Sequence, residues 1–485
     1  MSKKQFVWIM TDTTRYDMLG CYGNPAMRTP NLDALAAQGV RYEYAYSAQP
    51  VCGPARSLLF TGLFPHENGS WGNCMPLGAD VKTLGQRLSS HGVRCAYIGK
   101  WHLDGGDYFG NGVCPEGWAP ECWYDMKCYL DELDSDADRL RSRKAATCFE
   151  GDGITADFTF GHRVADRALR YIQNHQKDDF FLTVSFDEPH GPSLCPPEYA
   201  RMYQDYEPEL TPAQQDTLEN KPMYQKLWAQ AAASQASPNR APMLWGCNSF
   251  IDDEIGRVIA RLYTSDHGEG VGAHGLNHKG PAVYDEIARV PLIIAGPGLH
   301  QGEVYHHTVS HADLPATVLD YMGLPVPGAF TGKSLLPGLQ NGELDAEGSA
   351  FVEFNRYERD HDGFGGYQPM RAIVTDRYKL ALHMTDQDEL YDIQKDPWNL
   401  NNLIDDPAYA QVRNQLHDRI LDWMNRTRDP FRGYQWKCRP WRDLTADWEV
   451  DGWTRQYENE PGEYRQKDYS TGLTMVESSR YKKKK

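Results

Sequence analysis

A cysteine and an arginine at the start of a predicted helix are the residues whose types and spacing most directly suggest chemistry. In the run Cys52-Gly53-Pro54-Ala55-Arg56, Pro54 suits the first turn of a helix, so Cys52 lies just before a helix N-terminus. Free backbone N–H groups and the helix dipole attract anions there, and Arg56 can bind oxyanion oxygens with two hydrogen bonds. Taken alone, the pattern fits equally well a cysteine that caps a buried helix beside an arginine in a structural ion pair.

Further polar residues stand directly after predicted strands. Asp12 follows a strand over 5–10, and Lys100 and His102 follow a strand over 93–98. In an open α/β sheet, ligands bind at the carboxyl ends of the strands, so these side chains are expected to converge there. The other motifs of this kind are Glu188-Pro189-His190-Gly191-Pro192, Thr264-Ser265-Asp266-His267-Gly268-Glu269, and His274-Gly275-Leu276 with Lys279.

The elements that must position these residues alternate along the chain. Short apolar runs alternate with helical patterns through the first two thirds of the chain, which is typical of a mainly parallel sheet covered by helices. After Pro337 the pattern changes to short strands and hairpins over 349–400. The sequence therefore predicts a doubly wound α/β domain over 1–345 and a smaller α+β domain over 346–485, whose tail wraps the surface. Strands are expected at 5–10, 93–98, 180–186 and 290–295, and helices opening at 29–31 and spanning 80–91, 155–175, 249–262 and 311–322.

Composition excludes several classes of function. With 50 Lys and Arg against 67 Asp and Glu, the formal net charge is −17, which argues against nucleic acid as the main partner. No apolar run approaches the roughly 18 residues that cross a bilayer, and the stretch over 6–10 is too short for a secretion signal. The 11 cysteines show no paired framework, so we expect a cytoplasmic protein. The oligomeric state stays open.

Taken together, the motifs resemble those of the type I sulfatases of the alkaline phosphatase superfamily, and the bacterial cytoplasmic members in particular. They occur in the family's order from residue 5 to about residue 403, and the run over 389–392 resembles its C-terminal hallmark, Glu-Leu-Tyr-Asp. The resemblance implies an alkaline phosphatase-like fold and a sulfuric ester hydrolase. The family's signature, Cys-x-Pro-x-Arg followed by Thr-Gly, is present as Cys52, Pro54, Arg56, Thr61 and Gly62.

The same resemblance implies a modified cysteine and a metal. Cys52 would be oxidised by a formylglycine-generating maturation enzyme to an aldehyde, which hydrates to a geminal diol. Asp12, Asp266, His267 and an oxygen of the modified Cys52 would hold one divalent ion. Calcium is the family's usual ion; all-oxygen sites favour calcium or magnesium, and an imidazole shifts the preference toward manganese. Thr13 stands where many members carry Asp, Gln or Asn, so the identity of the metal stays open.

The chemistry of a sulfate ester explains why these residue types converge. Its cleavage spreads negative charge over the equatorial oxygens and the leaving alkoxide, so cations and a proton donor must already be in place. By their positions in the family's motifs, Arg56 would support the diol, and Lys100 and Lys279 would bind sulfate oxygens. His190 would protonate the leaving alcohol, and His102 would take the proton of the second hydroxyl as the sulfated intermediate collapses.

A segment over 353–368 mixes aromatic and polar residues in a predicted loop. Such loops suit sugar recognition, and Arg356 and His361 are its candidate substrate-binding residues. The segment fits a loop at a domain interface equally well.

One step of the sequence does not fit the expected fold. The predicted helix over 249–262 leaves only Tyr263 before Thr264, yet a strand of about 5–6 residues must cross the sheet ahead of Asp266. We therefore expect that residues are missing between Ala260 and Thr264, or that the sheet is rearranged there.

The sequence thus predicts a cytoplasmic sulfatase that acts on a sulfate monoester of a small carbohydrate. A long polysulfated polymer is not expected, because the net negative charge would repel it. Two alternatives stay open. A phosphonate monoester or phosphodiester hydrolase of the same superfamily would use the same nucleophile and metal, and a protein whose Cys52 is never oxidised would only bind anions.

Overall fold

The computed structural model describes residues 3–106, 109–144, 148–149, 151, 153–207, 209–233, 241–258, 261–342, 348–356 and 366–442. Residues 1–420 and 421–485 form two separate compact units. The predicted division of the chain at 345/346 stays a prediction. Among the helices that the structure describes, none has both the length and the apolar composition that crossing a lipid bilayer requires.

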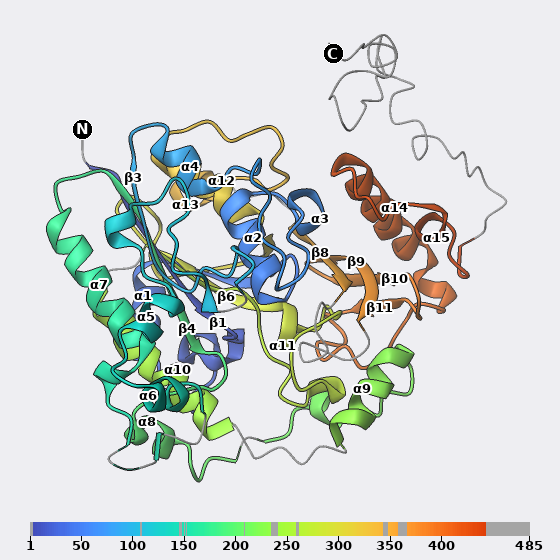
Figure 1. The fold of residues 1–485 in the computed structure, drawn as a ribbon. Coiled ribbons are helices and arrows are strands. Elements are labelled where there is room, and N and C mark those ends of the chain that lie inside the picture. The colour runs from blue at the N-terminus through green and yellow to red at the C-terminus, as the bar shows by residue number, and fades with distance from the viewer. Residues whose placement is uncertain are drawn as a thin grey trace, which may run out of the picture. The chain divides into compact units, whose positions relative to one another are not determined.

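A seven-stranded sheet forms the centre of the first unit (Figure 1). Its strand order is β3-β4-β1-β5-β6-β2-β7, and β6 runs antiparallel to both of its neighbours whereas the other pairs are parallel. The predicted doubly wound, mainly parallel sheet is confirmed. The strands are β1 (Gln5–Asp12), β2 (Val40–Tyr46), β3 (Arg94–Gly99), β4 (Phe180–Pro189), β5 (Leu262–Ser265), β6 (Arg289–Ile294) and β7 (Glu303–Ser310).

Helices alternate with the strands along much of the chain. The α-helices are α1 (Pro30–Gln38), α2 (Cys52–Thr61), α3 (Pro65–Asn68), α4 (Leu84–Ser89), α5 (Met126–Asp131), α6 (Asp136–Arg141), α7 (Phe160–Asn174), α8 (Pro197–Met202), α9 (Met223–Ala233), α10 (Ala241–Gly256), α11 (Asp285–Ala288), α12 (Asp313–Met322), α13 (Leu336–Asn341), α14 (Ala410–Arg426) and α15 (Tyr434–Lys437). Short 3-10 helices occur at Tyr16–Met18, Gly20–Tyr22, Pro120–Cys122, Ala156–Phe158, Pro212–Gln215, Ala273–Gly275 and Pro407–Tyr409.

Strand β1 shows why the sheet carries helices on both faces. Its side chains alternate between two hydrophobic cores, because successive residues of a strand point to opposite faces. Val7 and Ile9 pack in the core that α1, α7 and α10 cover, and Trp8 and Met10 pack in the core that α2, α4 and α12 cover (Figure 1). Because residues 6–10 are all apolar, the strand is buried on both of its sides.

A second sheet follows, with four antiparallel strands in the order β11-β10-β9-β8. This agrees with the short strands and hairpins expected over 349–400. Its first strand adjoins the segments around α2 and α3, since Glu353 N–H donates to Ala48 O at 2.7 Å and His66 N–H donates to Glu353 Oε1 at 3.0 Å. The strands are β8 (Ser349–Arg356), β9 (Tyr367–Thr375), β10 (Tyr378–His383) and β11 (Glu389–Asp392).

The strand ahead of Asp266 corrects one expectation. The predicted helix over 249–262 is wrong at its end, because α10 ends at Gly256, where a Cβ atom would lie 2.2 Å from the Asn31 side chain of α1. Arg261 N–H then donates to Val7 O at 2.9 Å, and β5 begins at the next residue. Residues already present therefore form the short strand. Residues 259–260 lie outside the described residues, so the expectation that residues are missing between Ala260 and Thr264 stays a prediction.

Candidate active site

Two neighbouring parallel strands bring Asp12 and Asp266 side by side. The register of β1 with β5 ends at the pair Thr11 and Ser265, and Asp266 N–H donates to Thr11 O at 3.2 Å. Asp12 ends β1 and Asp266 follows β5, so both carboxylates leave the same edge of the sheet. Both are fully buried, as is His267, the next residue along the chain. The predicted convergence of strand ends therefore occurs here.

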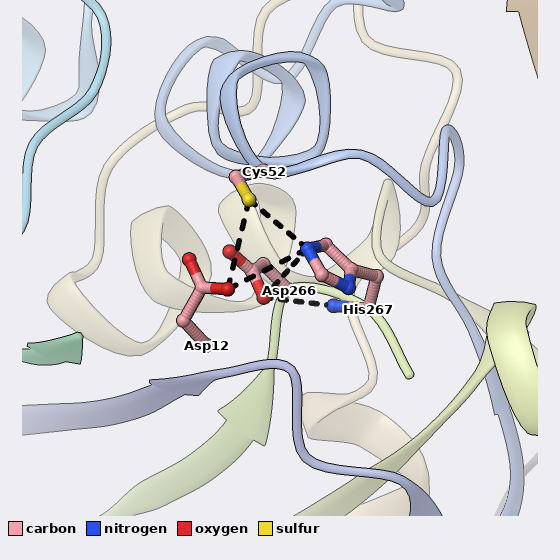
Figure 2. A group of neighbouring side chains, drawn as sticks. All are labelled: Asp12, Cys52, Asp266 and His267. Carbon is pink, nitrogen blue, oxygen red and sulfur yellow. Dashed lines mark hydrogen bonds and ion pairs between the residues drawn. The ribbon is translucent and has the colours of Figure 1, made fainter. Parts of the chain in front are cut away.

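Helix α2 places Cys52 against these residues (Figure 2). Cys52 is the first residue of the helix, and its Sγ lies 3.1 Å from His267 Nε2 and 3.6 Å from Asp12 Oδ1. Lys279 Nζ donates to the same sulfur at 2.8 Å. Every residue of α2 is buried, so the helix fixes the sulfur within the protein. The sulfur therefore lies where a lysine, an imidazole and a carboxylate meet.

The orientation of His267 leaves one ring nitrogen for a ligand. Its Nδ1 lies 2.8 Å from Gly268 O, and because a carbonyl oxygen can only accept, Nδ1 carries the hydrogen. The lone pair of Nε2 then faces the carboxylates, 3.5 Å from Asp12 Oδ1 and 3.7 Å from Asp266 Oδ1. Burial lowers the pKa of His267, which favours the neutral imidazole that binds metals. This backbone hydrogen bond fixes the tautomer that a metal site requires.

The residues present fit a divalent metal. Asp12, Cys52, Asp266 and His267 each offer one ligand atom, and these atoms lie within 4.8 Å of one another. Burial acts to raise the pKa of Asp12, but nearby positive charge, above all that of Lys100, outweighs it and holds the pKa well below its usual range. Burial and the charge of Asp12 raise the pKa of Asp266. Two crowded carboxylates with an imidazole form a donor set that a divalent cation would stabilise.

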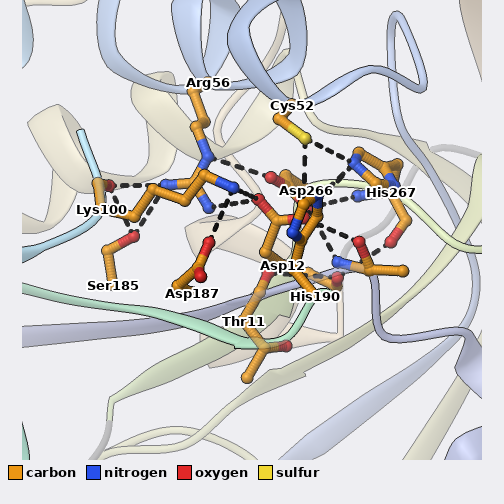
Figure 3. A network of polar contacts seen from close by, with 12 residues as sticks. Thr11, Asp12, Cys52, Arg56, Lys100, Ser185, Asp187, His190, Asp266 and His267 are labelled. Atoms are coloured by element: carbon orange, nitrogen blue, oxygen red, sulfur yellow. Dashed lines mark hydrogen bonds and ion pairs between the residues drawn. The ribbon is translucent and has the colours of Figure 1, made fainter. Parts of the chain in front are cut away.

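Arg56 joins the two carboxylates to the strands around them (Figure 3). Its Nε donates to Asp266 Oδ2 at 2.9 Å and its Nη2 donates to Asp12 Oδ2 at 3.2 Å. Nη1 donates to Lys100 O and to Ser185 Oγ, both at 2.7 Å. The side chain is fully buried, so these hydrogen bonds hold a charge that has no access to water. Such a rigid, planar group suits the predicted role of orienting the nucleophile.

Lys100 forms a second buried ion-pair group, with a partner that the sequence analysis did not single out. Its Nζ lies 2.7 Å from Asp12 Oδ2 and 2.9 Å from Asp187 Oδ1. Burial acts to lower the pKa of Lys100, but these two carboxylates outweigh it and raise the pKa. The ammonium group therefore stays charged at the site. Asp187 lies near the end of β4, as Asp12 does on β1, and this shared position is the signal that could have identified it.

Lys279 and His190 lie together beside the sulfur. His190 Nε2 is 3.5 Å from Lys279 Nζ, and its Nδ1 donates to Gly191 O at 2.9 Å. Burial and the charge of Lys100 lower the pKa of His190. With the hydrogen on Nδ1 and the ring neutral, the lone pair of Nε2 faces the lysine that contacts Cys52.

The remaining candidates have different outcomes. His102 is buried and stands two residues after Lys100, with a positive φ of 61°. Arg356 is exposed and ends β8. His361 lies outside the described residues. The catalytic, metal-binding and substrate-binding roles of all these residues stay predictions.

Comparison with protein-family models gives two matches. Residues 4–324 match the model described as Sulfatase. Residues 272–426 match the model described as N-sulphoglucosamine sulphohydrolase, C-terminal. The first match includes Asp12, Cys52 and Asp266 of the site described above, and the second includes the antiparallel sheet.

Individual proteins resemble the chain over most of its length. It is 42% identical over 467 residues to "Uncharacterized sulfatase YidJ" of Escherichia coli (strain K12), covering 92% of this chain and 93% of that protein. It is 25% identical over 516 residues to the N-acetylglucosamine-6-O-sulfatase of Bacteroides thetaiotaomicron, covering 88% and 87%. The solved phosphonate monoester hydrolase of Agrobacterium radiobacter has a TM-score of 0.71 and 24% identity, covering 88% of this chain and 96% of that chain. This last likeness concerns the fold.

Proposed function

The chain belongs to the sulfatase family and hydrolyses sulfate esters, and on this premise we propose that it cleaves a sulfate monoester of a small carbohydrate. We propose further that the nucleophile is a formylglycine made from Cys52 by a maturation enzyme and that one divalent metal assists it. The observation that carries the proposal is the position of the Cys52 sulfur, 2.8 Å from Lys279 Nζ and 3.1 Å from His267 Nε2.

The metal would be held by Asp12, Asp266, His267 and the modified Cys52 side chain. Calcium is the first candidate, and manganese and magnesium are the others. A formylglycine supplies a geminal diol as the nucleophile, and a divalent ion supplies positive charge beside the diol and the sulfate. The remaining steps are assigned to residues of this chain.

Three cations would bind the anionic groups. Arg56, fixed by its bonds to Asp12 and Asp266, supports the nucleophile from within the helix. Lys100 and Lys279 bind sulfate oxygens as negative charge builds up on them. Lys279 is suited to this role because its Nζ already contacts the Cys52 sulfur.

Two histidines would move protons. His190 Nε2, which holds no proton in the neutral ring, would take up the proton released by the attacking hydroxyl and pass it to the oxygen of the leaving alcohol as the bond between sulfur and that oxygen breaks. His102 would accept the proton of the second hydroxyl, which would allow free sulfate to leave. Ester and water are thereby converted to alcohol and sulfate.

The substrate class is supported by the chain's relatives and by its charge. One relative, which is 25% identical to this chain, is named N-acetylglucosamine-6-O-sulfatase. The net charge of −17 opposes the approach of a long polyanion, which favours a small sulfated sugar. Arg356 and His361 are proposed to contact that sugar. We also propose a catalytic domain over 1–345, a smaller domain over 346–485, and a cytoplasmic location, which the lack of a paired framework among the 11 cysteines supports.

An assay of the purified protein, matured with a formylglycine-generating enzyme, tests the proposal. Aryl sulfate and aryl phosphonate esters are compared side by side, because a phosphonate monoester hydrolase would use the same nucleophile and metal. We expect faster hydrolysis of the sulfate ester and loss of turnover in Cys52→Ala. Cys95→Ala, which alters a buried cysteine of β3, is the matched control and should keep activity. Faster phosphonate cleavage would favour the second function.

The mass of the Cys52 peptide tests the nucleophile separately. The matured peptide should have lost sulfur and gained an aldehyde oxygen. A peptide that keeps plain cysteine in protein with full activity would contradict the proposed nucleophile.

A further inference from the structure

The loop over 266–280 supplies two groups of the proposed active site. His267 lies at its start and Lys279 near its end. Within the loop, Gly270 N–H donates to His278 O at 3.2 Å and Gly272 N–H donates to Leu276 O at 2.9 Å. These bonds close the loop on itself, but they attach it to no other element. Its position in the protein must therefore come from contacts with other segments.

Helix α11 holds the first part of the loop. Gly268 N–H donates to Ile287 O and Glu269 N–H donates to Glu286 O, both at 2.8 Å. The approach is close, because a Cβ atom on Gly268 would lie 2.1 Å from Glu286 O. The residue next to His267 is thus fixed to α11, which itself begins directly after Tyr284.

His274 holds the middle of the loop. Its ring stacks on the ring of Tyr284, with 3.9 Å between the centroids, and its Nδ1 lies 2.6 Å from Asp216 Oδ2. Gln225 Nε2 donates to the carbonyl oxygen of His274 at 2.9 Å. His274 has a positive φ of 50°, an unfavourable conformation for a residue with a side chain, which surrounding contacts must maintain. Tyr284 therefore contacts the loop at its centre and starts the helix that holds its beginning.

A buried carboxylate of the second sheet holds Tyr284 in turn. The Tyr284 hydroxyl lies 2.5 Å from Glu389 Oε1 and 2.9 Å from Gln225 Oε1, so its one hydrogen is shared between two acceptors. Tyr391 OH also donates to Glu389 Oε1 at 2.6 Å, and His383 Nε2 lies 2.9 Å from Oε2. Burial acts to raise the pKa of Glu389, but the hydrogen bonds from His383 and Tyr284 together with the nearby charge of Lys221 outweigh it and lower the pKa to about 2. The carboxylate is therefore charged, and a charged acceptor makes the stronger hydrogen bond.

We propose that Glu389 is a positioning residue, which through Tyr284 fixes the loop that carries His267 and Lys279. The significance of this loop for catalysis rests on the function proposed above. The hydrogen bonds of Glu389 go to Tyr284, Tyr391 and His383, so it acts on the active site through other residues. This assigns a purpose to the Glu-Leu-Tyr-Asp motif of β11, which contributes no group to the site.

Hydrogen–deuterium exchange of the full chain without added metal tests the proposal. Glu389→Gln keeps the shape of the side chain and removes its charge, and Tyr284→Phe removes the hydroxyl. In both variants we expect the amides of Gly268, Glu269 and Gly272 to exchange about tenfold faster or more, because their protection depends on local opening of the loop. The amides of β1 should be unchanged. If Glu389→Gln fails to fold, Tyr284→Phe still gives the answer.

Asp392→Asn is the matched control. It makes the same kind of change on the same strand, but an odd number of residues away, so the side chain points to the opposite face. Asp392 is buried and pairs with the half-exposed Arg377 at 2.9 Å. Its variant should leave loop exchange unchanged. The proposal is overturned if loop exchange stays unchanged in both Glu389→Gln and Tyr284→Phe, or if Asp392→Asn accelerates it equally.

A calcium titration by calorimetry adds a second readout. We expect the calcium Kd to rise about tenfold in Glu389→Gln, because His267 is less well placed, and to stay unchanged in Asp392→Asn. An unchanged Kd in Glu389→Gln would overturn the proposed link to the metal ligand. A wild-type protein that binds no calcium would count against the proposed metal, and the exchange result would then decide the present inference by itself.

Discussion

Arg56 Nε donates to Asp266 Oδ2 at 2.9 Å, and neither side chain has any exposure to solvent. One guanidinium group therefore serves both as counter-charge for a buried carboxylate and as a fixed cation beside Cys52. Because Asp12 shares this arginine, the ion pairs form a network in which each member depends on the others. Removing Arg56 leaves Asp266 buried without its counter-charge, whereas Asp12 keeps Lys100 as a partner.

The first prediction concerns this network. Arg56→Ala should lower the free energy of unfolding by about 3–5 kcal/mol, because it leaves the buried carboxylate of Asp266 unpaired, and it should abolish turnover. The free energy of unfolding of Arg56→Lys should lie between those of the wild type and Arg56→Ala, since lysine keeps the charge but not the planar arrangement of donors. Urea denaturation followed by circular dichroism measures the effect. Arg41→Ala, which breaks a more exposed pair with Glu43, is the control and should cost less than about 1 kcal/mol. Equal losses at the two positions would contradict the argument.

The second prediction concerns the metal. A chelator should lower both the activity and the melting temperature, since an ion that binds the folded state alone stabilises it. Free calcium at 100 times its Kd should restore about 2.7 kcal/mol. Differential scanning calorimetry with and without the chelator measures this. The chelator should lower the melting temperature of Asp12→Asn by less than that of the wild type, because this variant lacks one of the two carboxylates. If the chelator leaves the melting temperature of the active wild-type protein unchanged, this result would count against the metal site.

The third prediction concerns Thr13, whose φ of 72° is unfavourable for a β-branched residue. Asn tolerates this conformation better and brings an amide oxygen that can ligate a metal. Thr13→Asn should therefore stabilise the protein by about 1 kcal/mol and tighten calcium binding. Thr13→Val is the control, because it keeps the strain and loses the hydroxyl that donates to Asp12 Oδ1 at 2.7 Å. It should neither stabilise the protein nor tighten calcium binding. Thermal melts and calcium titrations of both variants decide, and a less stable Thr13→Asn would refute the strain argument.

The fourth prediction concerns pH. Burial and the charge of Asp187 raise the pKa of Glu188 from 4.5 to about 7. A raised pKa means that the folded state binds the proton more tightly, so this stabilisation is complete below pH 4.5 and is lost as the pH rises toward about 7. The loss is about 3 kcal/mol in size.

Glu188→Gln cannot ionise and should escape this loss. Its melting temperature relative to wild type should rise between pH 5 and pH 8, as measured in matched buffers. Glu116→Gln changes an exposed carboxylate and should show no such trend. A constant difference between Glu188→Gln and wild type across this range would show that Glu188 ionises at its ordinary pKa.

The sequence predicted much of the fold and of the candidate site because its signals are local. Apolar runs marked β1, β3, β4 and β6, and polar residues directly after strands marked Asp12 and Lys100. The strands β2, β5 and β7 were not predicted. In β2, polar Arg41 and Glu43 interrupt the apolar run, and β5 has only four residues, which a helical pattern extending from α10 obscured. Segments with such weak local patterns form strands because they pair with neighbouring strands of the sheet.

By itself, the sequence determined the residue types of the site, their order, and the strand ends and helix start on which they stand. The tertiary structure alone decided which of them touch. Lys100, which follows β3, pairs with Asp187 of the neighbouring strand β4. Glu389 lies in a separate sheet, 105 residues from Tyr284 along the chain, and still accepts its hydrogen bond. No period or motif encodes such contacts, because they arise from strand order and burial. A charge removed from water must find its partner wherever the fold brings one.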